Sequence, residues 1–130
     1  AFEHFAAKPV FTRWHPEVLR DYVAAGTEPA GAVRALSFRR EVETEIYRTL
    51  PHHLPHVLRR HPLACPVAFI GGTASAEVRQ VGLRATERLT QGRVSWIEGG
   101  HLFPMERPLE TAEAVLSQLR SLAGAHRATG

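Results

Sequence analysis

Two short apolar runs in the second half of the chain predict β-strands. Residues 65–72 are almost entirely apolar and end in two glycines, which is typical of a strand buried on both faces of a parallel sheet. Residues 93–97 form a second run that also stops near a pair of glycines. A helix is predicted between them, capped by Ser75, with an apolar stripe at Val78, Val81, Ala85 and Leu89. Such a crossover is nearly always right-handed, so we expect two parallel strands that are neighbours or near-neighbours.

The last helix is predicted to begin at Pro108, because proline is favoured in the first helical turn. Its apolar positions recur at helical spacing. We expect a core face of Leu109, Ala112, Val115, Leu116, Leu119 and Leu122. Residues 124–130 are expected to form a flexible tail, as chain ends commonly do.

The first half of the chain shows mostly helical spacing. Helices are predicted over residues 16–26 and 40–50, the second with Val42, Ile46 and Leu50 along one face, and a shorter helix follows near 54–58, closed by His61 and Pro62. Residues 2–13 are expected to be loop or frayed helix, 27–31 a turn, and 33–38 an extended segment. The chain therefore divides into a helical segment at 1–62, a β-α-β-α unit at 63–123 and the tail.

Two parallel strands alone cannot bury both faces and both edges of a sheet. Each open edge presents unpaired backbone groups, and so small a core is only marginally stable. We therefore expect further strands, either from a preceding segment that is missing from this sequence or from a partner chain, to complete the folded sheet.

Composition and charge exclude several classes of protein. The 130 residues are 44% hydrophobic and 22% charged, which are values of a folded globular domain. The net charge of +3 comes without a basic run interleaved with aromatics, which argues against nucleic-acid binding. No apolar stretch approaches the roughly 20 residues of a membrane span, and the first residues are not a secretory signal. We expect a soluble protein, with a cytoplasmic location favoured although the single Cys65, expected to be a buried thiol, excludes neither compartment.

His101 follows the second predicted strand, at the edge where open α/β sheets place ligand chemistry. Histidine exchanges a proton near neutral pH, as a general base must. From Gly99 the chain reads Gly-Gly-His, an apolar pair, Pro-Met-Glu-Arg-Pro and then Glu-Thr-Ala at the start of the last helix. This stretch resembles the end of an α/β-hydrolase, in which the last strand delivers the catalytic histidine. The resemblance continues more weakly back to about Arg13.

The resemblance implies an α/β fold that is part of the hydrolase fold: two C-terminal parallel strands with flanking helices, preceded by a helical lid at 1–62. It implies a serine-type esterase or acyl hydrolase in which His101 is the general base. Trp14, Phe38 and Tyr47 of the lid would then favour a small hydrophobic ester-like substrate, with packing in the core of the lid as the alternative role for these residues. No cofactor is expected.

The nucleophile that such an enzyme needs is absent from these residues. A nucleophile elbow reads Gly-x-Ser-x-Gly, and none of the five serines has this setting. In the resembled family the elbow precedes the lid, so we expect the nucleophile to lie outside this chain. The chain alone is then expected to be inactive.

The acid that orients the histidine is also altered. The resembled family places an aspartate where this chain has Ser75, and serine cannot hold an imidazolium by charge. Glu77 is the local candidate acid, with stabilisation of the helix start as its structural alternative. An acid from the missing half is a further alternative. Glu98 and Glu106 flank His101, and Glu106 is expected to anchor the start of the last helix.

Other functions remain open at this point. The same fold can serve as a non-catalytic binding or assembly protein. The loop at residues 71–75 follows a strand and precedes a helix, as in phosphate-binding loops, although the full signatures are missing. The histidines at 52, 53, 56 and 61 form a cluster, but no cysteine or nearby carboxylate completes a metal-ligand set, so no metal site is expected.

Overall fold

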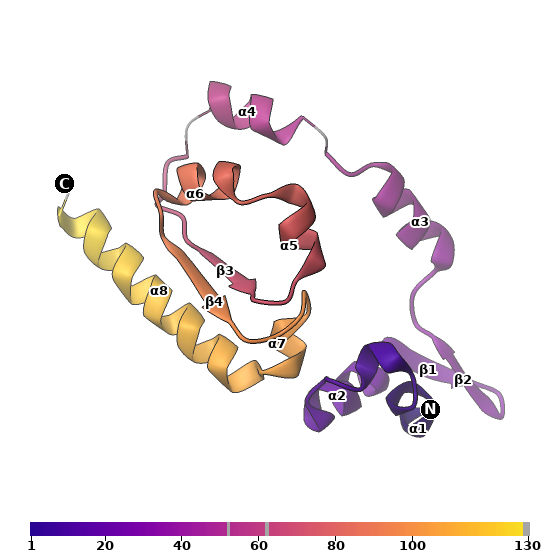
Figure 1. Ribbon diagram of the computed structural model, residues 1–130. Coiled ribbons are helices and arrows are strands. Elements are labelled where there is room, and N and C mark those ends of the chain that lie inside the picture. Colours follow the sequence, from indigo (N-terminus) through magenta and orange to yellow (C-terminus); the bar gives the residue numbers. More distant parts are fainter. Residues whose placement is uncertain (52, 62, 129–130) are drawn as a thin grey trace. The chain divides into compact units, whose positions relative to one another are not determined.

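The computed structural model describes residues 1–51, 53–61 and 63–128, and the chain forms two compact units, Ala1–Leu63 and Ala64–Gly130 (Figure 1). Short helices and a β-hairpin make up the first unit. Parallel strands with flanking helices make up the second. Helices and strands therefore occur together, as expected for the α/β class. His52 and Pro62 lie outside the described residues.

A cluster of partly exposed aromatic side chains packs in the first unit beside its two buried aliphatic residues. Residues 2–13, expected to be loop or frayed helix, form the short helix α1 (Phe2–Ala6) and the 3-10 helix η1 (Pro9–Phe11). Helix α2 (Pro16–Gly26) confirms the predicted helix at 16–26. Leu19 and Val23 of α2 are buried. The rings that contact one another belong to Phe5, Phe11, Trp14 and Tyr22, with centroids 5.0–6.2 Å apart.

A β-hairpin follows α2, where the sequence predicts only a turn at residues 27–31. Strands β1 (Thr27–Ala30) and β2 (Val33–Leu36) pair antiparallel. The turn is confined to two residues because Gly31 adopts a φ of +63°, a conformation that suits tight hairpin turns. The expectation failed because such a turn needs only Gly31 and Ala32, which leaves Thr27–Ala30 free to pair.

The remaining helices of the first unit are largely exposed. Helices α3 (Arg40–Arg48) and α4 (Leu54–Arg60) confirm the predicted helical segments. However, Val42 and Ile46 are 53% and 59% exposed, so the apolar face predicted for α3 has no packing partner among the described residues.

The second unit is a β-α-β crossover followed by a long helix. Strands β3 (Phe69–Gly72) and β4 (Val94–Ile97) pair in parallel, with Phe69 opposite Val94 and Gly72 opposite Ile97. This confirms the predicted pair of neighbouring parallel strands. The helix predicted between them is two helices, α5 (Ala76–Val81) and α6 (Arg84–Thr90). Gly82, at a φ of +79°, ends α5, and Val81 is 86% exposed rather than part of a continuous apolar stripe.

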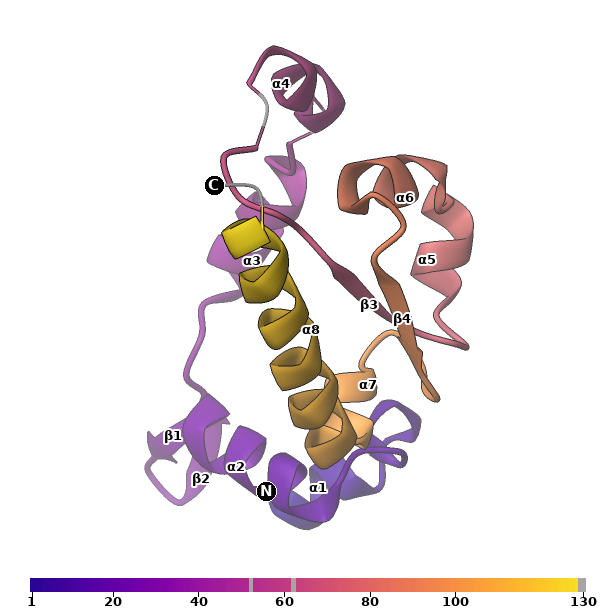
Figure 2. The ribbon, with the colours of Figure 1, turned by 90° about the vertical axis from the view of Figure 1, so that its left-hand side faces the viewer.

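The two faces of this sheet are covered by different helices (Figures 1 and 2). Ser95 of β4 contacts the side chain of Gln118 on helix α8 (Pro108–Ala128). The next residue, Trp96, points to the other face because strand side chains alternate. There it meets the ring of Phe69, on the side of α5 and α6.

Helix α8 does not bury the apolar face predicted for it. Leu109 and Leu119 are 77% and 56% exposed, and Val115 and Leu116 are exposed too. Within residues 108–124, the half-buried positions of this helix are Pro108, Thr111, Ala114, Gln118 and Leu122. A two-stranded sheet is narrow, so only one thin stripe of the helix can reach it. Of the predicted core face, only Leu122 belongs to that stripe. The helix also includes residues 124–128, which belong to the segment predicted as a flexible tail.

The described strands β3 and β4 pair only with each other. Their outer edges carry backbone groups that the described sheet leaves unpaired, so completion of the sheet by further strands stays a prediction. Among the described residues, no helix is both long enough and apolar enough to cross a membrane.

Candidate functional site

His101 lies on a loop that hydrogen bonds fasten to the carboxyl end of β3. The backbone N–H of Thr73 donates to the carbonyl of Ile97 at 2.9 Å, and the N–H of Ala74 donates to the carbonyl of Gly99 at 2.8 Å. The loops that follow the two parallel strands are therefore joined directly. This is the edge of an α/β sheet at which ligands usually bind.

The other side of the histidine loop is held by helix α7 (Phe103–Glu106). Both carboxylate oxygens of Glu106 accept the N–H of Gly100, at 3.2 and 3.3 Å. Phe103 is buried beneath the loop. The sequence predicts that Glu106 anchors the last helix, but in the structure its carboxylate reaches back and anchors the loop that carries His101.

Ser75 makes three polar contacts, although only 2% of it is exposed. It is the N-cap of α5, and its Oγ accepts the N–H of Val78 at 3.2 Å. The same Oγ donates to Oε2 of Glu77 at 3.1 Å. It also lies 3.2 Å from Nδ1 of His101. One hydroxyl thus joins a helix start, a carboxylate and an imidazole.

Glu77 and His101, both named from the sequence, are brought together by this serine. Oε2 of Glu77 is 3.6 Å from Nδ1 of His101, within ion-pair range but too long for a hydrogen bond. The pKa of Glu77 lies below its ordinary value, first because its own backbone hydrogen bond favours the carboxylate. The hydrogen bond from Ser75 and the charges of His101 and Arg79 act in the same direction, against partial desolvation.

The opposite nitrogen of the ring is open. Among the described residues, no group hydrogen-bonds to Nε2 of His101, and the side chain is 56% exposed. A ring held at Nδ1 and open at Nε2 can accept a proton from a group that approaches from outside. This is the arrangement that a general base requires.

Arg107 links the charged groups on the far side of the loop. Its guanidinium lies 3.3 Å from Glu98 and 2.7 Å from Glu110. Both contacts are at the surface, where such pairs contribute little to stability. Glu98 is therefore accounted for by Arg107 and is not part of the group around His101.

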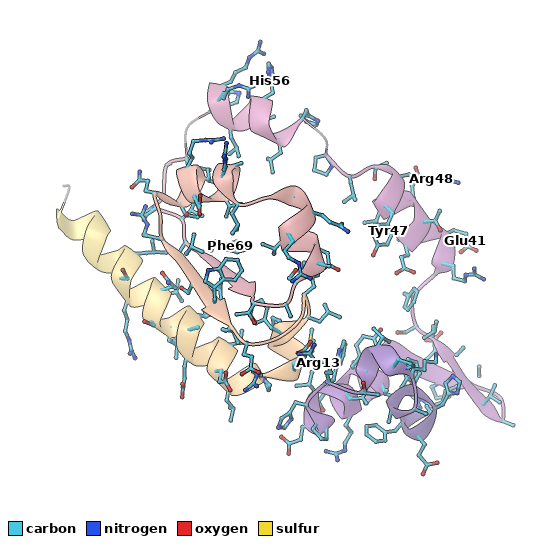
Figure 3. The ribbon with its side chains drawn as sticks, in the orientation of Figure 1. Arg13, Glu41, Tyr47, Arg48, His56 and Phe69 are labelled. Carbon is cyan, nitrogen blue, oxygen red and sulfur yellow. The ribbon has the colours of Figure 1, made fainter. Side chains whose placement is uncertain are left out.

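The aromatic residues predicted to contact substrate belong to the first unit. Trp14 packs within the aromatic cluster of that unit, against Phe11 and Tyr22. Phe38 is 44% exposed, and Tyr47, on α3, is 68% exposed (Figure 3). A packing role thus accounts for Trp14, while Phe38 and Tyr47 keep free surface.

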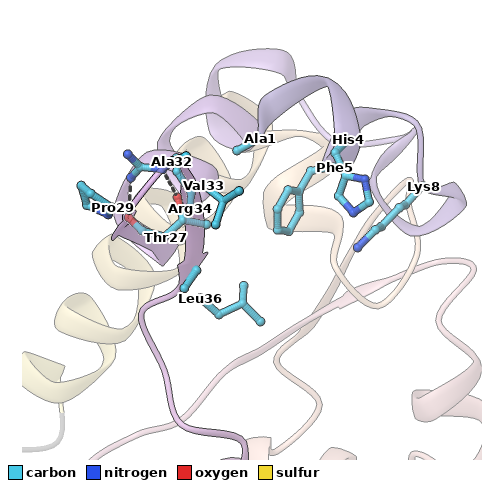
Figure 4. Close-up of a pocket in the computed structure, with 12 residues that line it drawn as sticks. Ala1, His4, Phe5, Lys8, Thr27, Pro29, Ala32, Val33, Arg34 and Leu36 are labelled. Atoms are coloured by element: carbon cyan, nitrogen blue, oxygen red, sulfur yellow. Dashed lines mark hydrogen bonds between the residues drawn. The ribbon is translucent and has the colours of Figure 1, made fainter.

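An open hollow of about 780 Å³ lies between α1 and the hairpin of the first unit (Figure 4). Phe5, Val33 and Leu36 give it apolar walls, and Lys8 adds a cation. The guanidinium of Arg34 is used within the hairpin, where Nε donates to Oγ1 of Thr27 at 2.7 Å. The hollow contains no member of the group around His101, so it is not the candidate site.

The other sites considered from the sequence receive little support. The N–H groups of Thr73, Ala74 and Ser75 all donate to backbone carbonyls, so these three amides are not available to hold a phosphate. Within the described ranges, no three potential ligands come together to hold a metal ion; His52 of the histidine cluster lies outside these ranges.

Cys65 is exposed, which corrects the prediction of a buried thiol. The strand begins only at Phe69, so Cys65 precedes the sheet and is not covered by it.

The role of Ser75 as a link between Glu77 and His101 is not predicted from the sequence, which indicates only a helix cap and a lost acid. A usable signal is nevertheless present. A cap serine followed two residues later by a glutamate places both side chains at the first turn of a helix. When that turn follows a parallel strand, both lie at the edge of the sheet that carries His101.

Comparisons of the chain with protein-family models, with curated proteins and with solved structures find no match. A function for this chain is therefore argued from the geometry of Ser75, Glu77 and His101.

Proposed function

We propose that this chain is the histidine-bearing half of a serine-type α/β-hydrolase that acts on an ester or similar acyl substrate. His101 is its general base and Glu77 its acid. The nucleophilic serine comes from outside these 130 residues. The observation that carries the proposal is that His101 is held at Nδ1 and open at Nε2, on the carboxyl edge of a parallel sheet.

Hydrolysis of an ester through an acyl-enzyme needs one general base that accepts and returns a proton in each of two steps. The external serine hydroxyl attacks the acyl carbonyl while its proton passes to Nε2 of His101. The imidazolium, stabilised by the charge of Glu77, then gives that proton to the departing alcohol, which leaves an acyl-serine. Water then removes the acyl group from the serine. Its oxygen bonds to the acyl carbon as its proton passes to Nε2, the bond between that carbon and the serine oxygen breaks, and the imidazolium returns the proton to the serine, which releases the carboxylic acid.

A fluorophosphonate probe tests this proposal, because it labels only a serine that a base activates. The protein is expressed from its complete coding sequence (the full-length protein) and the labelling rate is measured. Substitution of His101 by alanine is expected to lower the rate about 10³-fold or more. His15→Ala, a histidine at the start of α2, is the matched control and should label at the normal rate.

Three outcomes would contradict all or part of the proposal. The first is that the full-length protein does not react with the probe, which favours the non-catalytic binding protein of the same fold. The second is that labelling persists unchanged in His101→Ala. Ester hydrolysis by the 130-residue chain alone, lost in His101→Ala, would show that the nucleophile lies within the chain.

A further inference from the structure

Three groups share one hydroxyl at the edge of the sheet, and their hydrogens can be assigned. Serine has a single O–H to donate and two lone pairs that accept. The N–H of Val78 can only donate, so it uses one lone pair of Ser75 Oγ. The remaining contacts of this oxygen are with Glu77 and His101, and one of them must receive the hydrogen.

The charge of Glu77 decides which one receives it. An ionised carboxylate only accepts hydrogen bonds, so a contact of 3.1 Å between Oε2 and Ser75 Oγ requires the serine hydrogen to lie between them. The lowered pKa of Glu77 keeps it ionised near neutral pH. Ser75 then has only a lone pair to offer to His101, so Nδ1 must carry a hydrogen. In the neutral ring, the second nitrogen, Nε2, is then left with the lone pair that a base needs.

We infer that Ser75 is a positioning residue that links Glu77 to His101 and holds the imidazole in the tautomer with hydrogen on Nδ1. The carboxylate does not reach the ring itself, since 3.6 Å separates Oε2 from Nδ1. The hydroxyl spans this gap. The inference rests on the proposed function for its catalytic meaning, but the tautomer is a property of the protein that can be measured without any substrate.

The test is nitrogen NMR of the full-length protein labelled with ¹⁵N-histidine, at a pH where the ring of His101 is neutral. The two tautomers give distinct ¹⁵N shifts for Nδ1 and Nε2. We expect the Nδ1–H form to dominate in the unmodified protein. It should remain dominant in Ser75→Thr, which keeps the hydroxyl, and fall to a mixture of both forms in Ser75→Ala.

Substitutions at Glu77 test the link between the carboxylate and the tautomer of His101 even if changes at the buried serine disturb folding. Glu77 is on the surface, with 55% of its side chain exposed. Glu77→Ala removes the acceptor and frees the serine hydrogen to point at Nδ1, so the Nδ1–H form should be lost. Glu77→Gln keeps an acceptor oxygen and should retain that form. Glu87→Ala on α6 is the matched control and should change nothing.

The inference is overturned if His101 of the unmodified protein is not mainly the Nδ1–H form. It is also overturned if folded Ser75→Ala and Glu77→Ala both keep that form. Failure of the proposed function gives a different result. In that case the fluorophosphonate probe does not label the protein, but the tautomer of His101 still depends on Ser75 and Glu77.

Discussion

Gly72 at the end of β3 and Gly100 beside the histidine are in such close backbone contact that a side chain at residue 72 would overlap the carbonyl oxygen of Gly100. A methyl group has no room there, because the obstacle is main chain rather than the end of a flexible side chain. Glycine at 72 therefore lets the loop that carries His101 lie directly on the strand.

Gly72→Ala is expected to destabilise the full-length protein by about 2–3 kcal/mol, because the inserted methyl group must push the loop away from the sheet. Denaturant unfolding measures this change, and the tautomer of His101 should be disturbed in the same variant. Gly124→Ala in α8 is the matched control. A Cβ at Gly124 meets nothing within 4 Å, so alanine should stabilise the helix by about 0.5–1 kcal/mol. Equal effects of the two substitutions would contradict the close approach at Gly72.

Glu106→Ala should loosen the histidine loop from its other side. The carboxylate accepts the N–H of Gly100, and a hydrogen bond to a charged group contributes about 1.5–3 kcal/mol, so we expect a loss of about 1–2 kcal/mol at this half-buried site. Amide hydrogen exchange at Gly100 is the direct measurement and should accelerate. Glu106→Gln keeps an acceptor and should lose less, while Glu113→Ala on exposed α8 serves as the control. Unchanged exchange at Gly100 in Glu106→Ala would show that another group holds the loop.

The lowered pKa of Glu77 predicts a pH dependence of stability. Because the folded-state pKa lies below the ordinary carboxyl value of 4.5, the stabilising contribution is fully present above that value. It is lost as the pH falls through the lowered pKa and the carboxylate takes up a proton. The difference in melting temperature between the unmodified protein and Glu77→Gln should therefore be constant above about pH 5 and shrink at lower pH. A difference that grows on acidification would mean that the folded protein raises the pKa of Glu77 instead of lowering it.

The small size of the parallel sheet predicts how the 130-residue chain behaves by itself. Its two parallel strands have four residues each, and the leucines of α8 are exposed. We expect the isolated chain to associate or to melt without a cooperative transition, because so little apolar surface is buried. Calorimetry together with analytical ultracentrifugation provides the measurement. A cooperative melt of a monomer would remove the need for additional strands.

Local signals in the sequence predict most of the elements of this protein. Pro16 and Ser75 occupy the helix starts expected of them, and the two apolar runs become adjacent parallel strands. The failures come from backbone conformations that single glycines allow. Gly31 turns the chain within two residues and creates a hairpin, and Gly82 divides one expected helix into two.

Burial is less predictable than the elements, because it depends on what lies opposite each face. The apolar period of α8 correctly predicts a helix, but the stripe that meets a sheet of two strands is set by the width of that sheet. Leu109 therefore lies outside the core that its spacing predicts. The same reasoning applies to α3, where Val42 and Ile46 share a face that nothing among the described residues covers.

The candidate site could be predicted in part. The position of His101 after a strand identifies it, and the absence of an aspartate at 75 directs attention to Glu77. The bridging role of Ser75 could not be predicted, because it depends on a 3.6 Å separation that leaves the carboxylate just short of the ring. Distances of this kind arise from the backbone of the β3–α5 loop and not from residue types.

Ser75, Glu77 and His101 all belong to a single strand–helix–strand crossover and the turn that follows it. These three residues are consequently encoded in one uninterrupted stretch of the chain. Genetic exchange that moves this stretch into another sheet would carry the imidazole together with its linking hydroxyl and its neighbouring carboxylate.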